Sequence, residues 1–219
     1  MLSLFALSAG FAAVSAAPSN LFSGFEDPTI VCSAGGHATC VQGVIPVAAS
    51  AMNTQLNFPA GFPANQSVVT ETIVEFLQTN TPLPAQVEAA KVKVSGVYKI
   101  GAKLCYPVGQ SPNASLVQIL THGVGFDKSY WDFYSASYSY QDAAAVAGYT
   151  TFAYDRLGIG ASDHPNPIEV VQAQLEVSIA HSLVCNTSPL HALERGARAR
   201  SLCSYLLRDH QFCTIPNKK

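Results

Sequence analysis

Two short glycine-rich segments hold the residues whose types and spacing suit chemistry. The first, His122-Gly123-Val124-Gly125, follows an apolar run, and the second, Asp155 to Ser162, follows another. Glycines let the chain turn sharply and let a substrate approach backbone N–H groups. Such groups can stabilise an oxyanion that develops on a reacting carbonyl. His122, Gly123 and Val124 are therefore candidates for an oxyanion hole, and a turn that serves only the structure is an equal alternative.

The same glycines do not predict a nucleotide site. Gly158 and Gly160 lack the third glycine of a G-x-G-x-x-G loop, and no lysine follows them as in a phosphate-binding P-loop. A zinc site needs about four converging ligands, and no second cluster joins Cys32, His37 and Cys40. We expect neither a metal nor another cofactor.

Strands must place these segments at one edge of a sheet. Leu116–Leu120 is a continuous apolar run, which predicts a strand buried on both faces, and Thr150–Tyr154 predicts a second. Upstream, Val92–Tyr98 and Lys99–Tyr106 alternate in polarity and predict an antiparallel hairpin with a tight connection near Gly101.

Helices are predicted between and after the two buried strands. An alanine-rich segment ends at Gly148, a natural C-terminal cap. Pro167 should open a second helix, whose apolar positions recur at three and four residues: Ile168, Val171, Leu175, Ile179 and Leu183. Parallel strands need helical crossovers, so this order predicts an α/β fold.

The paired segments resemble those of the α/β-hydrolase superfamily. Asp155-Arg156-x-Gly158-x-Gly160-x-Ser162 begins 33 residues beyond His122, and the resemblance covers about Val92 to Leu183. It implies a partial α/β-hydrolase sheet, made of an N-terminal hairpin and parallel strands with crossover helices. The Val124 N–H would then be an oxyanion donor. The segment with Asp155, Arg156, Gly158, Gly160 and Ser162 would be a structural loop, and the parent activity would be hydrolysis of small ester-like substrates by a serine.

The catalytic part of that family's pattern is missing. Its nucleophile lies in a Gly-x-Ser-x-Gly elbow, and the partial matches Gly109-Gln110-Ser111 and Gly160-Ala161-Ser162 lack the second glycine. His191, Asp209 and His210 occur in a basic tail without a strand pattern. We identify no catalytic residue. The chain is expected to be a truncated, inactive member of a secreted hydrolase family or, alternatively, a non-catalytic secreted binding protein.

Truncation has a structural consequence. The early strands of a parallel sheet would be present without the central ones, so Thr150–Tyr154 should lie at an open edge. The aromatic segment after the first glycine-rich turn is either core or an exposed binding patch; its rings are Tyr130, Trp131, Phe133, Tyr134, Tyr138 and Tyr140.

Composition and charge divide the chain. The net charge of -2 provides no basic surface for nucleic acid. Residues 1–184 hold 12 acidic and 6 basic side chains, whereas residues 185–219 hold 2 acidic and 6 basic side chains. We expect a signal peptide over 1–17, an extension over 18–90, the hydrolase-like part over 91–184 and an atypical tail over 185–219.

The N-terminal features predict a secreted protein. The longest apolar run, Leu2 to Val14, is shorter than the roughly 20 residues that span a bilayer, so no membrane span is expected. Cys32 and Cys40, in a glycine-rich segment, suit a local disulfide. Three sequons predict glycosylation at Asn65, Asn113 and Asn186.

Overall fold

The computed structural model describes residues 24–58, 61, 64–109, 111, 113–114 and 116–185, without the side chain of Cys185. The predicted signal peptide, the tail beyond residue 185 and the Asn186 sequon lie outside these residues. No helix within the described part of the chain has the length and apolar character needed to cross a membrane.

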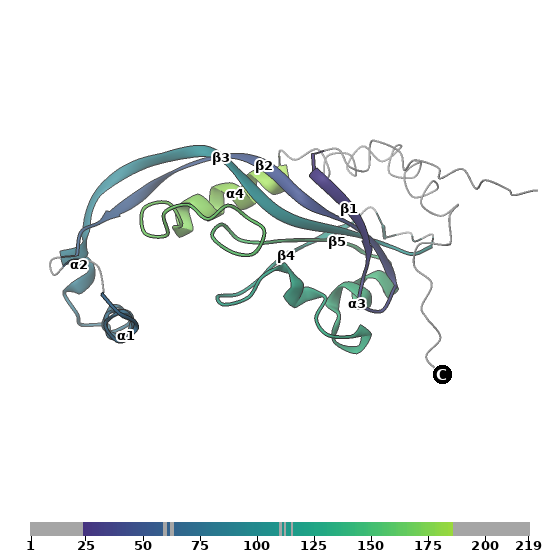
Figure 1. The fold of residues 1–219 in the computed structure, drawn as a ribbon, viewed down its shortest axis with the longest axis horizontal. Coiled ribbons are helices and arrows are strands. Elements are labelled where there is room, and N and C mark those ends of the chain that lie inside the picture. Colours follow the sequence, from purple (N-terminus) through teal and green to yellow (C-terminus); the bar gives the residue numbers. More distant parts are fainter. Residues whose placement is uncertain are drawn as a thin grey trace, which may run out of the picture.

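An open, mixed, five-stranded sheet organises the molecule, in the order β1-β2-β3-β5-β4 (Figure 1). The strands are β1 (Glu26–Cys32), β2 (Ala38–Leu56), β3 (Glu88–Pro107), β4 (Val117–Thr121) and β5 (Thr150–Tyr154). Of the described strands, only β4 and β5 pair in parallel, and the other three pairings are antiparallel. The sheet and its helices agree with the expected α/β class.

Six helical segments accompany the sheet among the residues that the structure describes. They are α1 (Gln66–Phe76), α2 (Leu83–Val87), the 3-10 turns η1 (Lys128–Trp131) and η2 (Ala136–Tyr138), α3 (Tyr140–Val146) and α4 (Ala173–Cys185). Gly148, with φ of 89°, follows α3 in the left-handed conformation that closes many helices. The crossover from β4 through α3 returns the chain to the parallel strand β5.

The predicted hairpin near Gly101 is wrong, because β3 is one continuous strand of 20 residues. It pairs along almost its whole length with β2, from Ala38 opposite Pro107 to Leu56 opposite Glu88. Gly101 does not form a turn; its missing side chain lets Asp155 and Ala161 lie close to the β3 backbone. A Cβ at this position would lie 2.8 Å from a carboxylate oxygen of Asp155 and 2.8 Å from the Cβ of Ala161.

The predicted positions of the two buried strands also need correction. Every residue of β5 is buried, because β5 lies between β3 and β4 and is not the open edge. The open edge is β4, in which only Leu120 is buried. Leu116 and Ile119 are 55% and 37% exposed, since no described strand covers the outer side of β4.

The helix predicted from Pro167 begins six residues later, at Ala173. The side chain of Asn166 accepts hydrogen bonds from the amides of Ile168 and Glu169, which forms a separate turn before α4. Three α4 side chains, Leu175, Ile179 and Leu183, are almost fully buried in the core against the sheet. The apolar spacing correctly predicted the buried face of α4, but residues 167–172 lie in or just after the turn and not in the helix.

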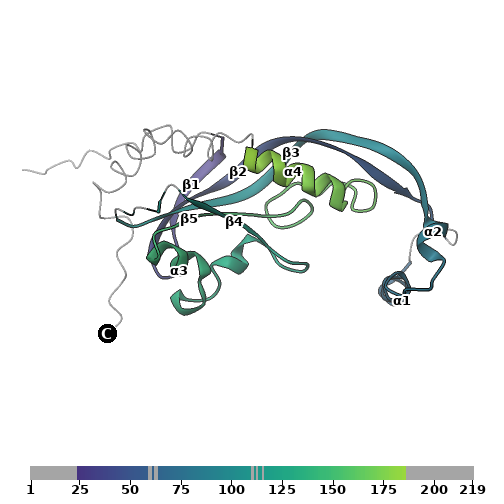
Figure 2. The same cartoon turned by 180° about the vertical axis from the view of Figure 1, so that it is seen from behind.

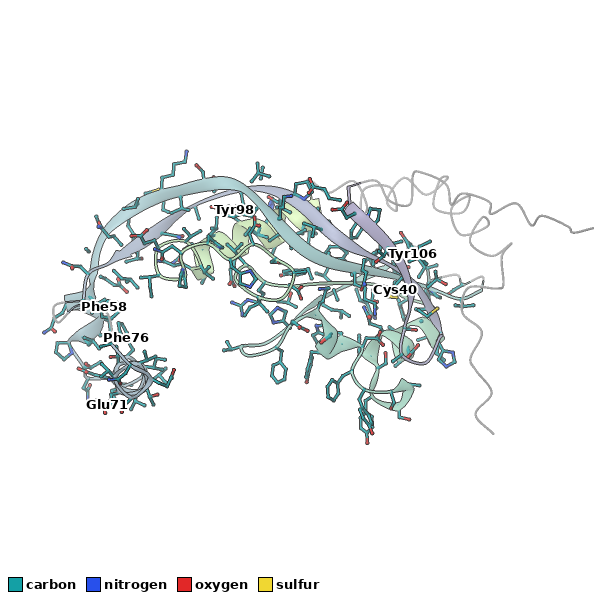
Figure 3. The ribbon with its side chains drawn as sticks, in the orientation of Figure 1. Cys40, Phe58, Glu71, Phe76, Tyr98 and Tyr106 are labelled. Carbon is teal, nitrogen blue, oxygen red and sulfur yellow. A yellow bond between two sulfur atoms is a disulfide. The ribbon has the colours of Figure 1, made fainter. Side chains whose placement is uncertain are left out.

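One end of the β2–β3 ribbon extends far beyond the rest of the sheet (Figures 1 and 2). It carries α1 and α2, and we call residues 64–87 the arm. No residue of α1 is buried. Figure 3 shows Phe58 and Phe76 at this distant end, and their ring centroids are 6.4 Å apart in an edge contact. The remaining elements form the body, in which the core lies between α4 and the sheet.

A disulfide joins Cys40 on β2 to Cys105 on β3. The two residues are directly opposite in the antiparallel ladder, with Cα atoms 4.0 Å apart, and both are buried. The predicted Cys32–Cys40 pairing is therefore wrong. Cys32 lies on β1 opposite Thr39, whereas the long pairing of β2 with β3 brings Cys105 to Cys40 from 65 residues away.

Candidate functional site

The two glycine-rich segments meet at the carboxyl ends of β4 and β5. Because these strands are parallel and adjacent, their following loops leave the same edge of the sheet, where ligands of open α/β sheets usually bind. The loops border an open cleft of about 430 Å³. Its lining is His122, Gly123, Val124, Gly125, Arg156, Leu157, Gly158, Ile159, His164, Pro165, Pro167, Val171 and Glu176.

His122 ties the two segments together. The Arg156 amide donates to its Nε2 across 2.9 Å, and Nδ1 lies 2.9 Å from the carbonyl oxygen of Gly123. Since an amide N–H only donates, Nε2 is the acceptor and the proton is on Nδ1. Both ring nitrogens are thus engaged with backbone, and the residue is only 3% exposed. His122 positions the cleft and is not free to act as a base.

Val124 stands at the mouth of the cleft. It is 91% exposed, and within the described ranges its amide N–H donates no hydrogen bond. Gly125, with φ of 83°, lets the chain turn directly after it. The role of the Val124 amide as an oxyanion donor stays a prediction.

Arg156 and Glu176 close the cleft on the side of α4. Arg156 Nε donates to Glu176 Oε2 across 2.7 Å, and a terminal guanidinium nitrogen donates to the same oxygen. The two side chains are 31% and 16% exposed. This ion pair offsets the charge of Arg156, and sequence reasoning missed it because Glu176 lies on the helix that follows the loop.

Asp155 joins the end of β5 to η1. Its carboxylate accepts hydrogen bonds from the Lys128 amide (2.7 Å), the Lys128 ammonium (2.6 Å) and the Ala161 amide (2.9 Å). Its side chain is fully buried. Ser162 donates to the Asp155 carbonyl and accepts from the Gly101 amide, which fastens the loop to β3. Asp155 is wholly occupied in holding this loop.

No serine within the described ranges donates its hydroxyl to a histidine ring. Ser111, from one of the partial elbow matches, donates instead to the Gly148 carbonyl across 2.9 Å. Ser162, from the other, donates to the Asp155 carbonyl across 2.7 Å. Neither is placed as an activated nucleophile, which needs a base within hydrogen-bond reach.

A buried polar cluster outside the lining of the cleft was not predicted from the sequence. Asp142 on α3 accepts from the Ser33 hydroxyl and from the amides of Gly35 and His37, in the turn between β1 and β2. The only local signal was the glycine-rich composition of that turn. No group of three or more metal-ligating side chains comes together in the part of the chain that the structure describes.

Asp132 links the same turn to β3. Burial alone would raise the pKa of Asp132, but hydrogen bonds from Lys103, Ser139 and the Ala34 amide outweigh it and hold that pKa below its ordinary value. The Lys103 ammonium lies 2.5 Å from the Asp132 carboxylate, and both side chains are nearly buried. This cluster has the character of a structural anchor.

The aromatic segment is an exposed surface, so the core alternative is wrong. Five of its six aromatic residues have more than 40% of their surface exposed to solvent: Tyr130, Phe133, Tyr134, Tyr138 and Tyr140. Four aromatic rings form a chain of contacts in the order Phe126, Tyr130, Trp131, Tyr140. The centroids of successive rings are 4.8, 5.4 and 5.6 Å apart.

The asparagines of two sequons lie among the described residues. Asn65 is exposed and is the N-cap of α1, where its side-chain oxygen accepts from the Val68 amide. Asn113 is half-buried in a turn before β4. Glycosylation at either position stays a prediction.

Neither a protein-family model nor a curated protein sequence matches the chain.

Proposed function

We propose that this chain is a secreted, α/β-hydrolase-like protein whose cleft binds a small, largely apolar ligand with an ester-like carbonyl group, without cleaving it. The observation that carries the proposal is the Val124 amide, which donates to no described residue, at the mouth of a cleft formed by two parallel strand ends. The carbonyl oxygen of the ligand accepts from this amide.

The lining of the cleft supports an apolar ligand. Apolar side chains predominate, among them Leu157, Ile159 and Val171, with two prolines beside them. The most deeply placed polar groups are already satisfied, since His122 bonds to backbone and Arg156 pairs with Glu176. Apolar walls with few oriented polar groups are typical of small-molecule sites.

Binding without cleavage is supported by what surrounds the Val124 amide. An oxyanion donor accelerates acyl transfer only together with a nucleophile and its base. His122, the histidine nearest in sequence to Val124, has both nitrogens occupied by backbone. The serines of the two partial elbows donate to backbone carbonyls.

The compartment is supported by the Cys40–Cys105 disulfide, since disulfides persist mainly in oxidising environments. The exposed position of the Asn65 sequon also suits a secreted chain. The apolar N-terminal segment remains the main reason to propose secretion.

The test is a titration of the full chain with methyl butyrate, followed by amide NMR shifts and calorimetry. The Val124 and Gly125 amides should shift first and furthest. Val124→Pro removes the donor and should weaken binding by several-fold to about tenfold, as expected for one net hydrogen bond. Val124→Ala keeps the amide and is the matched control. Shifts confined to another surface, or equal binding by both variants, would refute the site.

Absence of cleavage is tested separately with a fluorophosphonate probe and an ester assay. We expect neither labelling nor turnover. Stoichiometric labelling of one serine, with loss of a measurable esterase activity, would overturn this part of the proposal. The binding site itself is tested only by the titration.

A further inference from the structure

We propose that the open edge of β4 is the docking site for a second copy of this chain. The two β4 strands would pair antiparallel about a two-fold axis and join two five-stranded sheets into one. The inference rests on the backbone, the charges and the exposed apolar residues at this edge, and is independent of the ligand proposed above.

The direction of the peptide groups shows that the edge is open. The Thr150 amide on the β5 side donates to the Leu116 carbonyl, so the peptide groups of Leu116 and of every second residue after it face β5. The N–H and C=O groups of Val117, Ile119 and Thr121 therefore face away. β4 is the last strand in the sheet order of the described residues. A row of unpaired groups of this kind accepts another strand.

The other free edges carry residues that discourage such pairing. The outer strand β1 begins with Glu26, Asp27 and Pro28, and its register is irregular there. β2 has Pro46 just beyond the last residue that pairs with β1. Charged residues, prolines and irregularities are the usual protection of an edge strand.

The long edge of β3 toward the arm is protected in the same way, by the exposed Lys91 and Lys93. β4 differs, since no Asp, Glu, Lys or Arg occurs anywhere from Leu104 to Phe126. It also contains neither proline nor glycine. Among the described strands, β4 is the one whose edge is left without protection.

A second copy fits this edge because β4 is complementary to itself. In an antiparallel pair centred on Ile119, that residue faces its own counterpart, and Val117 of each copy faces Thr121 of the other. All three side chains are β-branched, which favours cross-strand packing, and no like charges meet. The exposed Leu116, Ile119 and Tyr140 border the edge and add apolar contact. Two-fold pairing closes the interface, so neither β4 remains open.

The test is sedimentation velocity of the purified full chain over a wide range of concentration. We expect a dimer of the 23.2 kDa chain. In the Ile119→Lys dimer, the two copies of residue 119 would face each other with Cα atoms about 5.5 Å apart. Repulsion between their ammonium groups should weaken dimerisation on the order of a hundredfold. The matched control is Val74→Lys on α1, at a residue that is 52% exposed against 37% for Ile119, and it should dimerise like the unmodified chain.

Complementary charges make the test specific for the two-fold axis. Ile119→Glu alone should also remain monomeric, whereas a mixture of Ile119→Lys and Ile119→Glu should form heterodimers. In the unmodified chain, the Ile119 and Thr121 amides should be protected from hydrogen exchange in a concentration-dependent manner. A dimer that survives Ile119→Lys, a monomer at every concentration, or a monomer with these amides protected by another segment would each overturn the proposal.

Discussion

The body and the arm are parts of one chain that hold their structure in different ways. In the body, α4 has three almost fully buried side chains against the sheet. Asp155 accepts two hydrogen bonds from Lys128, which lies 27 residues away, and one from the Ala161 amide. In the arm, α1 buries no residue. Its hydrogen bonds are local, such as those from the Val68 amide to Asn65 and from Thr72 to Val68.

This difference separates tertiary from local stabilisation. An isolated helix shorter than about 12–15 residues is marginal in water, because nucleation is costly and packing normally supplies most of the stability. α1 has 11 residues and no buried face. The body should therefore govern the global free energy of unfolding, while the arm should open and close nearly independently.

The largest effect should come from Asp155→Ala in the body. It leaves the Lys128 ammonium and two amides without their acceptor, and removing one partner of a buried ion pair costs about 3–5 kcal/mol. Glu71→Ala on α1 should change the free energy of unfolding by less than about 0.5 kcal/mol. Urea unfolding followed by Trp131 fluorescence measures both. Equal effects would remove the distinction between body and arm.

A pair of leucines tests the same distinction through packing. Leu175→Ala removes a fully buried side chain and should cost about 2–5 kcal/mol. Leu77→Ala, at the end of α1, removes a side chain that is 79% exposed and should cost less than about 0.5 kcal/mol. The measurement is the shift of the urea midpoint at unchanged slope. A large loss from Leu77→Ala would show that the arm packs against something.

The disulfide should stabilise the body by a somewhat smaller amount. Cys40 and Cys105 are 65 residues apart, and together Cys40→Ala and Cys105→Ala should lower the free energy of unfolding by about 2–4 kcal/mol. Thermal unfolding by circular dichroism measures the loss. No change would show that the ladder and core already fix these strands.

Acid should weaken the body through Asp132. Its pKa is lower in the folded chain than in the unfolded one, so the unfolded state binds more protons as pH falls. The resulting stability is present above the ordinary carboxyl pKa of about 3.9 and is lost as pH falls through the folded pKa. Asp132→Asn should flatten the decline in stability below about pH 4. A profile that keeps its slope would assign the decline to other carboxyl groups.

The smallest effect should be confined to the arm. Asn65→Ala removes the N-cap of α1 and should destabilise that helix by about 0.5–2 kcal/mol, without changing global unfolding. Asn65→Asp keeps a capping oxygen and removes the same sequon, which makes it the matched control. Hydrogen exchange of the α1 amides measures the difference. A shift in global unfolding would contradict the independence of the arm.

Sequence patterns identified the elements whose structure depends mainly on neighbouring residues in the chain. The apolar run Thr150–Tyr154 and the cap at Gly148 both lie where they were predicted. The order of the strands depends on contacts between distant residues, so β4 was expected inside and β5 outside. Gly101 suggested a turn, because a glycine required by a close neighbour and a glycine required by a turn look alike in sequence.

The candidate site was predicted in part. The meeting of the segments after His122 and Asp155 follows from two adjacent parallel strands, and the sequence already placed both strands. The bond from the Arg156 amide to the His122 ring depends on side-chain rotation, and the Arg156–Glu176 pair depends on how α4 packs. Neither has a local signature.

The cross-strand disulfide has a geometric consequence for the arm. A ladder can slip along its strands, and small side chains specify its alignment weakly. Directly beyond Ala48, three successive opposing pairs of β2 and β3 consist mostly of such residues: Ala49 with Gly96, Ser50 with Ser95 and Ala51 with Val94. Cys40 and Cys105 are held opposite each other at the other end of the same ladder. The bond therefore fixes the alignment of the whole ribbon, and with it where the ribbon ends and where α1 is presented.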